Sequence, residues 1–190
     1  MRKKNVIITA AVIVALGAGG VGAAYLAQRM DPATNEIKNA ERNQADVAFA
    51  QMMIEHHQGA LDMASLVADR SQRSDIIALA EQIEAAQAPE ISTMTAWLNA
   101  WGEPLEMTAM PGHGHMDMGG EDLSELKSLG GNAFDRAFLT MMIEHHQGAI
   151  DMAQVEQRDG TYADAKQLAR AIEASQTAEI TTMQRTLASL

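Results

Sequence analysis

The sequence has no cysteine among its 190 residues. Disulfide bridges, iron–sulfur clusters and thiolate metal sites are therefore excluded. A soft metal ion can still be held without thiolates, because methionine thioethers and histidine imidazoles also bind such ions. The chain contains 14 methionines and six histidines, which makes the positions of these residues the main question about the sequence.

Aromatic residues are also scarce, at 4% of the chain, although hydrophobic residues make up 47%. Alanine, leucine, isoleucine and methionine supply most of the apolar content, a mixture that favours helices over strands. Basic residues are few, and the formal net charge is -11 at pH 7. A nucleic acid or an anionic membrane is therefore not expected as a partner of the folded part. The composition predicts an all-α domain, and the length is enough for a sizeable core.

Charge is absent from one long segment, NVIITAAVIVALGAGGVGAAYLA, which follows Arg2, Lys3 and Lys4 and ends near Ala27. It is about long enough to cross a bilayer as a helix, and its basic flank predicts that the rest of the chain is exported. Residues 1–27 are thus predicted to be a cleaved signal peptide or a retained membrane anchor, and the length of the run favours the anchor. We expect an extracytoplasmic protein, located in the periplasm, at the cell surface or secreted, that touches the membrane only through this segment.

The chain aligns with itself at an offset of 89 residues without gaps. Residues 46–64 and 135–153 share 15 of 19 positions, and residues 80–94 and 169–183 share 9 of 15. Each of the first two segments contains the sequence MMIEHHQGA. Core packing explains many matched apolar positions but not the repeated His-His pair, since apolar cores tolerate swaps among similar residues. The sequence therefore predicts two units of one kind.

Each unit is predicted to fold as two helices joined by a short turn. The expected helices run from about Asn35 to Ala68, Asp75 to Trp101, Asn132 to Gln157 and Tyr162 to Ser189, with a turn at 69–74, a stop at Gly102 and Pro104, and a kink at Pro89. Two such hairpins predict a four-helix bundle with a pseudo-two-fold axis. The bundle is expected to cover residues 35–190, as repeat one (35–102), a linker (103–120) and repeat two (121–190).

The adjacent histidines of each unit fall on or beside the inward face of a helix at 100° per residue. A lone histidine on an apolar face is usually a core residue, but two adjacent pairs related by symmetry point to a metal site. Methionines at helical spacing from the histidines make copper a better match than zinc or iron. The predicted bundle ligands are His56, His57, His145, His146, Met52, Met63, Met141 and Met152.

The second helix of each unit carries an amide and a carboxylate on an otherwise apolar face: Gln87 and Glu90, then Gln176 and Glu179. If these groups are buried they must be paired, and a histidine on the facing helix is a natural partner. Gly59 and Gly148 lie in the middle of the first helices, where glycine costs roughly 1 kcal/mol relative to alanine. Close helix approach and room beside the histidines are both consistent with these glycines.

The linker reads EMTAMPGHGHMDMGG, and helix periodicity does not account for its methionines. It is predicted to capture Cu(I), Cu(II) or Ag(I). Because histidine binds a metal only when neutral, such binding is expected to weaken below about pH 6. The candidate linker ligands are Met110, His113, His115, Met116 and Met118, with Met107 at the start of the segment.

The motifs F-x-x-MMIEHHQGA-x-DMA and A-x-x-I-x-x-x-Q-x-x-EI-x-x-M make residues 35–190 resemble the DUF305 family of exported bacterial proteins. The resemblance implies a ferritin-like four-helix bundle, and copper binding linked to copper tolerance in some members. The residues matching the family pattern include Met94 and Met183, together with His56, His57, Met63, Gln87, Glu90, His145, His146, Met152, Gln176 and Glu179.

The sequence does not favour a metalloenzyme. A di-iron carboxylate enzyme would need Glu-x-x-His, and a hydrolytic zinc site would need H-x-x-x-H or H-E-x-x-H; the sequence has none of these motifs. No enzymatic activity is therefore expected. A metal-free envelope scaffold that docks a partner remains the alternative. Silver or zinc as the metal, a copper-handling protein partner, and self-association through Trp97 and Trp101 also remain open.

Overall fold

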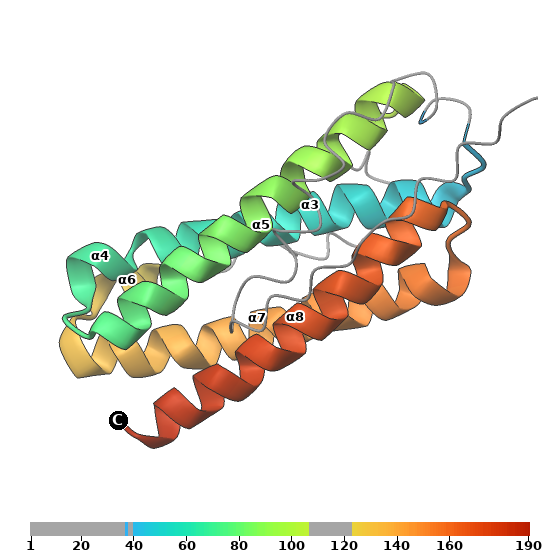
Figure 1. Ribbon diagram of the computed structural model, residues 1–190. Helices are drawn as coiled ribbons and strands as arrows, with labels where there is room; N and C mark the ends of the chain where they lie inside the picture. Colours follow the sequence, from blue (N-terminus) through green and yellow to red (C-terminus); the bar gives the residue numbers. More distant parts are fainter. Residues whose placement is uncertain (1–36, 38–39, 107–122) are drawn as a thin grey trace, which may run out of the picture.

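The computed structural model describes residue 37 and residues 40–106 and 123–190 (Figure 1). The predicted N-terminal segment and the methionine- and histidine-rich part of the linker lie outside these residues. Six helices, labelled as in Figure 1, make up the described part, which contains no strand. They are α3 (Gln44–Ser65), α4 (Val67–Arg70), α5 (Ser74–Trp101), α6 (Ser124–Ser128), α7 (Gly131–Asp159) and α8 (Ala163–Ala188).

The four long helices form two hairpins, which confirms the predicted all-α bundle. Helix α3 packs against α5, and α7 packs against α8. The hairpins meet mainly through α3 and α7. At one end the short α6, which the sequence analysis did not predict, lies near α4, and Arg70 Nη2 donates to the carbonyl of Lys127 at 3.1 Å (Figure 1). None of the described helices is both long and apolar enough to cross a bilayer.

Helix α3 begins at Gln44, later than the predicted start. Asn43 caps it: the Asn43 side chain accepts from Ala45 N at 2.8 Å and Asp46 N at 3.2 Å, while Asp46 Oδ2 accepts from Asn43 N at 2.6 Å. This reciprocal capping box fixes the helix start. At the other end Leu66 N donates to Met63 O at 3.2 Å, a tightened last turn that separates α3 from α4.

Helix α5 ends as predicted, since Gly102 adopts the left-handed conformation (φ 74°) that commonly follows a helix. The helix is continuous through Pro89. Trp97 and Trp101 are buried and pack edge-on against Tyr162, with ring centroids 5.4 and 5.3 Å from it. The suggestion that these tryptophans serve self-association is therefore wrong, because contacts within the chain cover them.

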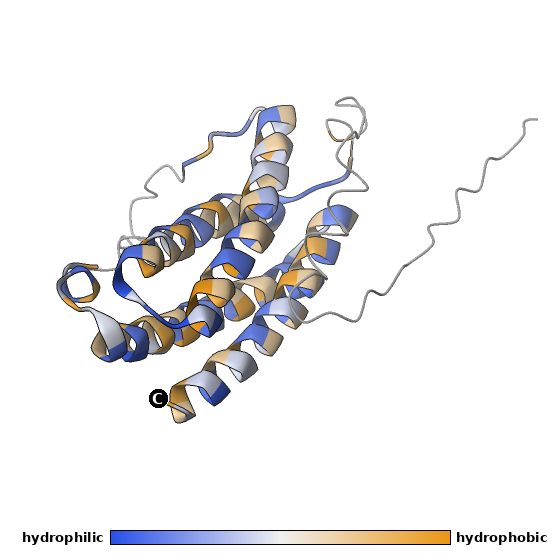
Figure 2. Ribbon diagram, turned by 60° about the vertical axis from the view of Figure 1, so that its left-hand side comes forward, coloured by the Kyte–Doolittle hydropathy of each residue, from blue (hydrophilic) through white to orange (hydrophobic). Residues whose placement is uncertain are grey.

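The bundle interior consists of two apolar clusters. The first includes Phe49, Met53, Met94, Trp97 and Ile172, and the second includes Met63, Ile83, Phe138, Met142 and Met183. Figure 2 shows polar and apolar residues alternating along each long helix, as expected for helices that bury one face. The clusters are related by the 89-residue offset: Phe49, Met53, Met94 and Ile172 of the first correspond to Phe138, Met142, Met183 and Ile83 of the second. The predicted pseudo-symmetry is therefore present in the packing.

Candidate functional site

The four histidines of the repeated motif lie in the interior. His56 and His145 are 5% and 4% exposed, and His57 and His146 are fully buried. Neither apolar cluster includes them. Four polar residues of α5 and α8 accompany these histidines: Gln87, Glu90 and Gln176, which are buried, and Glu179, which is partly buried. We call these eight residues the polar layer.

The two hairpins meet at His56 of α3 and His145 of α7. Their ring centroids are 3.7 Å apart and the ring planes are inclined by 42°. Gly148, one turn further along α7, makes room for this contact: a Cβ atom there would lie 3.0 Å from His56 Nε2. Of the two explanations for the mid-helix glycines, space beside a histidine therefore applies to Gly148.

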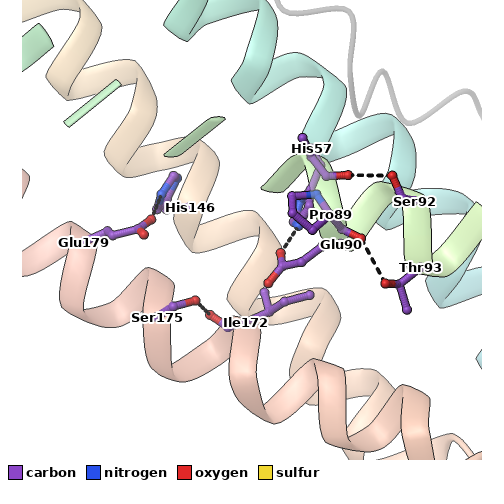
Figure 3. Close-up of polar contacts among 10 residues, drawn as sticks. His57, Pro89, Glu90, Ser92, Thr93, His146, Ile172, Ser175 and Glu179 are labelled. Carbon is purple, nitrogen blue, oxygen red and sulfur yellow. Dashed lines mark hydrogen bonds and ion pairs between the residues drawn. The ribbon is translucent and has the colours of Figure 1, made fainter. Parts of the chain in front are cut away.

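The other two histidines are each held by a carboxylate within their own hairpin (Figure 3). His57 Nε2 lies 2.7 Å from Glu90 Oε2, and His146 Nε2 lies 2.7 Å from Glu179 Oε2. The predicted pairing of histidine with glutamate is thus confirmed. An ionised carboxylate only accepts, so Nε2 carries the proton, and the Nδ1 atom of a neutral ring keeps its lone pair.

We call His56 and His145, which touch between the two hairpins, the inner histidines, and His57 and His146 the outer histidines. Burial keeps the inner histidines neutral. Burial, together with positive charge on the neighbouring His145, His57 and His146, lowers the pKa of His56 from 6.5 to about 2. Burial likewise lowers the pKa of His145 to about 3, reinforced by charge on His146 and His57. Neutral imidazole is the form that binds metal ions, so these rings need not lose a proton to act as ligands.

The polar layer contains many atoms without a hydrogen bond. Among the described residues, eleven buried side-chain nitrogen and oxygen atoms lack a partner, and eight of them belong to this layer. Natural proteins satisfy nearly all such atoms, because each unsatisfied one costs roughly 1–3 kcal/mol. The eight atoms are Nδ1 of His56, His57, His145 and His146, Nε2 of His145, both amide atoms of Gln87 and Oε1 of Gln176.

The predicted methionine ligands are not equivalent. Met63 and Met152 are buried, whereas Met52 and Met141 are only half-buried. Met63 is seven residues from His56, which puts it roughly 10 Å further along the helix axis. Met63 packs in the second apolar cluster, and its role as a ligand of the same ion as His56 stays a prediction.

Met53 and Met142, the second residues of each Met-Met pair, were not among the predicted site residues, and both are fully buried. Met94 and Met183, which match the family pattern, are fully buried as well. Met53 lies one helical turn from His57, and Met94 lies one turn from Glu90; both belong to the first apolar cluster. Met142 and Met183 stand in the same relation to His146 and Glu179, in the second cluster. The i, i+4 spacing from the outer histidine is the sequence signal that could have identified Met53 and Met142.

Part of the repeated motif lies on the surface. Gln58 donates to Asp62 at 3.0 Å and Gln147 donates to Asp151 at 3.1 Å, all four residues being on the outer side of their helices. These two glutamines therefore make the same surface hydrogen bond between successive helical turns in both repeats.

No group of three histidine, aspartate or glutamate side chains within residues 40–106 and 123–190 converges in a metal-binding arrangement. That finding does not concern methionine thioethers. The linker candidates Met110, His113, His115, Met116 and Met118 lie outside the described residues.

Comparisons with known proteins agree with this architecture. Residues 46–187 match the family model described as "Domain of unknown function (DUF305)". A comparison with curated proteins finds no match. Two solved DUF305 structures resemble the chain, each with 33% identity. The one from Streptomyces coelicolor, described as a candidate secreted protein, has a TM-score of 0.70 and covers 76% of this chain and 93% of that one; the fragment from Deinococcus radiodurans has 0.69, 78% and 98%.

A third similar structure is CopM in its Cu(II)-bound form, with 33% identity, a TM-score of 0.66, and coverage of 76% of this chain and 96% of that one. CopM also has solved structures in Cu(I)-bound, Ag-bound and apo forms, which are 30–31% identical to this chain.

Proposed function

The chain belongs to the DUF305 family, and from this premise we propose that it is an extracytoplasmic protein that binds copper or silver ions in its polar layer. Its role would be copper homeostasis or tolerance, through binding rather than catalysis. Export is proposed from the basic flank and apolar run of residues 1–27, and the similarity to a candidate secreted protein supports it.

The observation that carries the proposal is the concentration of unpartnered polar atoms in the polar layer. A purely structural polar core would pair these groups with each other, as it does for Nε2 of His57 and His146. Instead, all four Nδ1 atoms are buried and lack a partner within the described residues. A bound metal ion would supply the missing interaction for several of them together.

The donor atoms favour a soft metal. The Nδ1 atoms of His57 and His146 are proposed as ligands because Glu90 and Glu179 occupy the opposite nitrogen of each ring. Such carboxylate partners orient a metal-binding imidazole and raise its basicity. Imidazole and thioether together suit Cu(I), Ag(I) and Cu(II) better than hard cations. The copper- and silver-bound forms of CopM support the same choice of metals.

Methionines near the histidines are proposed as further ligands. Met53 and Met94 lie one turn from the His57–Glu90 pair, and Met142 and Met183 lie one turn from His146–Glu179. The half-buried Met52 and Met141 are one turn from His56 and His145, so thioethers lie near both the inner and the outer histidines.

Titration of the purified exported domain with Cu(I), Cu(II), Ag(I) and Zn(II) tests the proposal. We expect stoichiometric uptake of copper or silver, and loss of the ions bound by the polar layer when His56, His57, His145 and His146 are all replaced by alanine. A matched variant with leucine at the same positions refills the volume and should lose the same ions while remaining helical by circular dichroism. Unchanged uptake in a folded leucine variant would place the bound metal outside the polar layer, and no uptake by the natural chain would favour a metal-free scaffold.

A further inference from the structure

Asp46 holds the start of α3 against the turn between α7 and α8. Its side chain is fully buried, and Oδ1 accepts from Thr161 N at 2.9 Å and from Tyr162 N at 2.8 Å. Oδ2 accepts from Asn43 N at 2.6 Å. Asn43 adds a second link, since its Nδ2 donates to Asp159 O at 2.8 Å. The carboxylate of Asp46 therefore joins segments that lie more than one hundred residues apart in the sequence.

Glu156 lies in the last turns of α7, beside Gly160 and close enough to Asp46 for a hydrogen bond between the two carboxyl groups. It is 1% exposed, and neither carboxyl oxygen receives a hydrogen bond from a donor group of the described residues. Burial, together with a hydrogen bond to the adjacent Asp46 carboxyl and the charge of that group, raises the pKa of Glu156 to about 8. Glu156 is therefore protonated at neutral pH, and its carboxyl O–H can donate a hydrogen bond to the Asp46 carboxylate.

Among the described residues, one further cation and one further anion affect the pKa of Glu156. Lys166 of α8, whose Nζ donates to Gly160 O at 2.9 Å, opposes the rise in the Glu156 pKa, and Asp159 of α7 adds to it. Tyr162, at the start of α8, directs its hydroxyl to Asp164. The cation therefore offsets only part of the cost of ionising Glu156.

Gly160 provides the space for the Glu156 carboxyl group. Its φ of -70° is open to any residue, so backbone conformation does not require glycine. A Cβ atom there would collide with Glu156 Oε1 and lie 2.7 Å from the Glu156 carbonyl oxygen. Both the carboxyl group and the backbone carbonyl oxygen of Glu156 thus exclude a side chain at position 160 without a local shift.

The first unit differs at both of these positions. At the 89-residue offset, Val67 corresponds to Glu156, and Ser71 corresponds to Gly160, while Asp135 corresponds to Asp46. Val67, Ser71 and Asp135 are all buried. One end of the bundle therefore combines aspartate with valine and serine, and the other combines aspartate with glutamate and glycine. The paired difference indicates that the glutamate and the glycine act together.

We propose that a proton shared between the carboxyl groups of Asp46 and Glu156 fastens the start of α3 to the α7–α8 turn, and that this end of the bundle loosens as the pH rises and the proton is lost. The proposal is independent of metal binding. When this end opens, Glu156 regains an ordinary carboxyl pKa, so opening releases a proton. Each pH unit between about 5 and 8 should then raise the open population up to about tenfold. The opposite end, with Val67, has no corresponding acid.

The test compares the whole chain with Glu156→Gln and with Glu156→Val/Gly160→Ser. Glutamine keeps a donor for Asp46 and cannot ionise, whereas the double variant copies the valine and serine of the first unit. Hydrogen exchange of the Thr161 and Tyr162 amides, corrected for the intrinsic rate, reports opening from pH 5 to pH 9. We expect opening of the natural chain to increase up to pH 8, and both variants to give a flat profile.

Thermal unfolding over the same pH range, in the presence of EDTA, is the second measurement. The melting temperature of the natural chain should fall relative to both variants as the pH rises towards 8. Equal pH profiles in the natural chain and in whichever variant folds would overturn the proposal. Stabilisation of the natural chain by added CaCl₂, absent from Glu156→Gln, would also overturn it, since a cation rather than a proton would then bridge the carboxyl groups.

Discussion

The imidazole rings of His56 and His145 are equivalent in the two repeats and are also in contact, with centroids 3.7 Å apart. Residues that correspond under an internal duplication can touch only where the pseudo-symmetry axis passes between them. The axis of this bundle therefore runs through the polar layer, and each hairpin contributes one inner histidine and one outer histidine to it.

The space at Gly148 predicts an unusual response to alanine. A glycine-to-alanine change in a helix normally stabilises it by about 1 kcal/mol. Here the added Cβ would lie 3.0 Å from His56 Nε2, and His56 is held against His145. We expect Gly148→Ala to lower the free energy of unfolding by roughly 1–3 kcal/mol. Denaturant unfolding measures this change. In a His56→Ala background the same change should become stabilising; a destabilisation of equal size in both backgrounds would show that His56 is not the group that clashes.

The carboxylates that hold the outer histidines should control metal affinity. Glu90→Gln combined with Glu179→Gln preserves shape but removes the charge that supports each imidazole. We expect copper or silver to bind about 10–100-fold more weakly. Competition titration against a chelator measures the loss. The matched control replaces the exposed Glu55 and Glu144 with glutamine and should leave affinity unchanged. Equal affinities in the two double variants would mean that the carboxylates have only a structural role.

Acid should destabilise the metal-free protein through its inner histidines. The folded-state pKa values of His56 and His145 are lowered to about 2 and about 3, below the ordinary value of 6.5. As the pH falls from about 6.5 towards 3, the unfolded chain takes up protons that the folded chain does not. Stability should therefore fall by up to about 1.4 kcal/mol per pH unit for each histidine.

Denaturant unfolding at several pH values between 3.5 and 7 checks this loss. A His56→Leu/His145→Leu variant cannot take up these protons and should show a shallower decline. An identical decline in the variant would assign the acid sensitivity to other groups.

The linker prediction can be tested separately from the bundle. Replacing residues 107–118 with a glycine–serine segment of equal length should reduce the number of Cu(I) or Ag(I) ions bound without changing the melting temperature of the metal-free protein. Replacing only the methionines of this segment with leucine would distinguish thioether from imidazole binding. Unchanged stoichiometry in the glycine–serine variant would remove the linker from the ligand set.

Much of the fold could be predicted from the sequence because it depends on local signals. Helix periodicity, Gly102 and the 89-residue repeat were sufficient to predict two hairpins, and the position of Glu90 and Glu179 was sufficient to predict their pairing with histidine. The start of α3 was less predictable, because the capping side chain of Asn43 also bonds to the last residue of α7 and to the turn that follows it. Such a boundary depends on tertiary contacts.

The finer arrangement of the site was not predictable for a geometric reason. Adjacent helix residues differ by 100° in direction, so a stripe two residues wide contains both members of each His-His and Met-Met pair. The crossing of α3 and α7 decides that His56 contacts His145 while His57 turns to α5. It also decides that Met53 is buried more deeply than Met52. The proximity of Asp46 and Glu156, from different helices, likewise follows from packing alone.

Because the axis passes between His56 and His145, one kind of hairpin is enough to build the whole polar layer. Two separate half-length chains could associate to give the same set of imidazoles and carboxylates, but their assembly would depend on concentration. Covalent fusion makes that encounter intramolecular, so the site persists in a dilute compartment. Fusion also allows the two ends to differ. Glu156 and Gly160 in the second half, against valine and serine in the first, are a difference that a homodimer could not keep to one end.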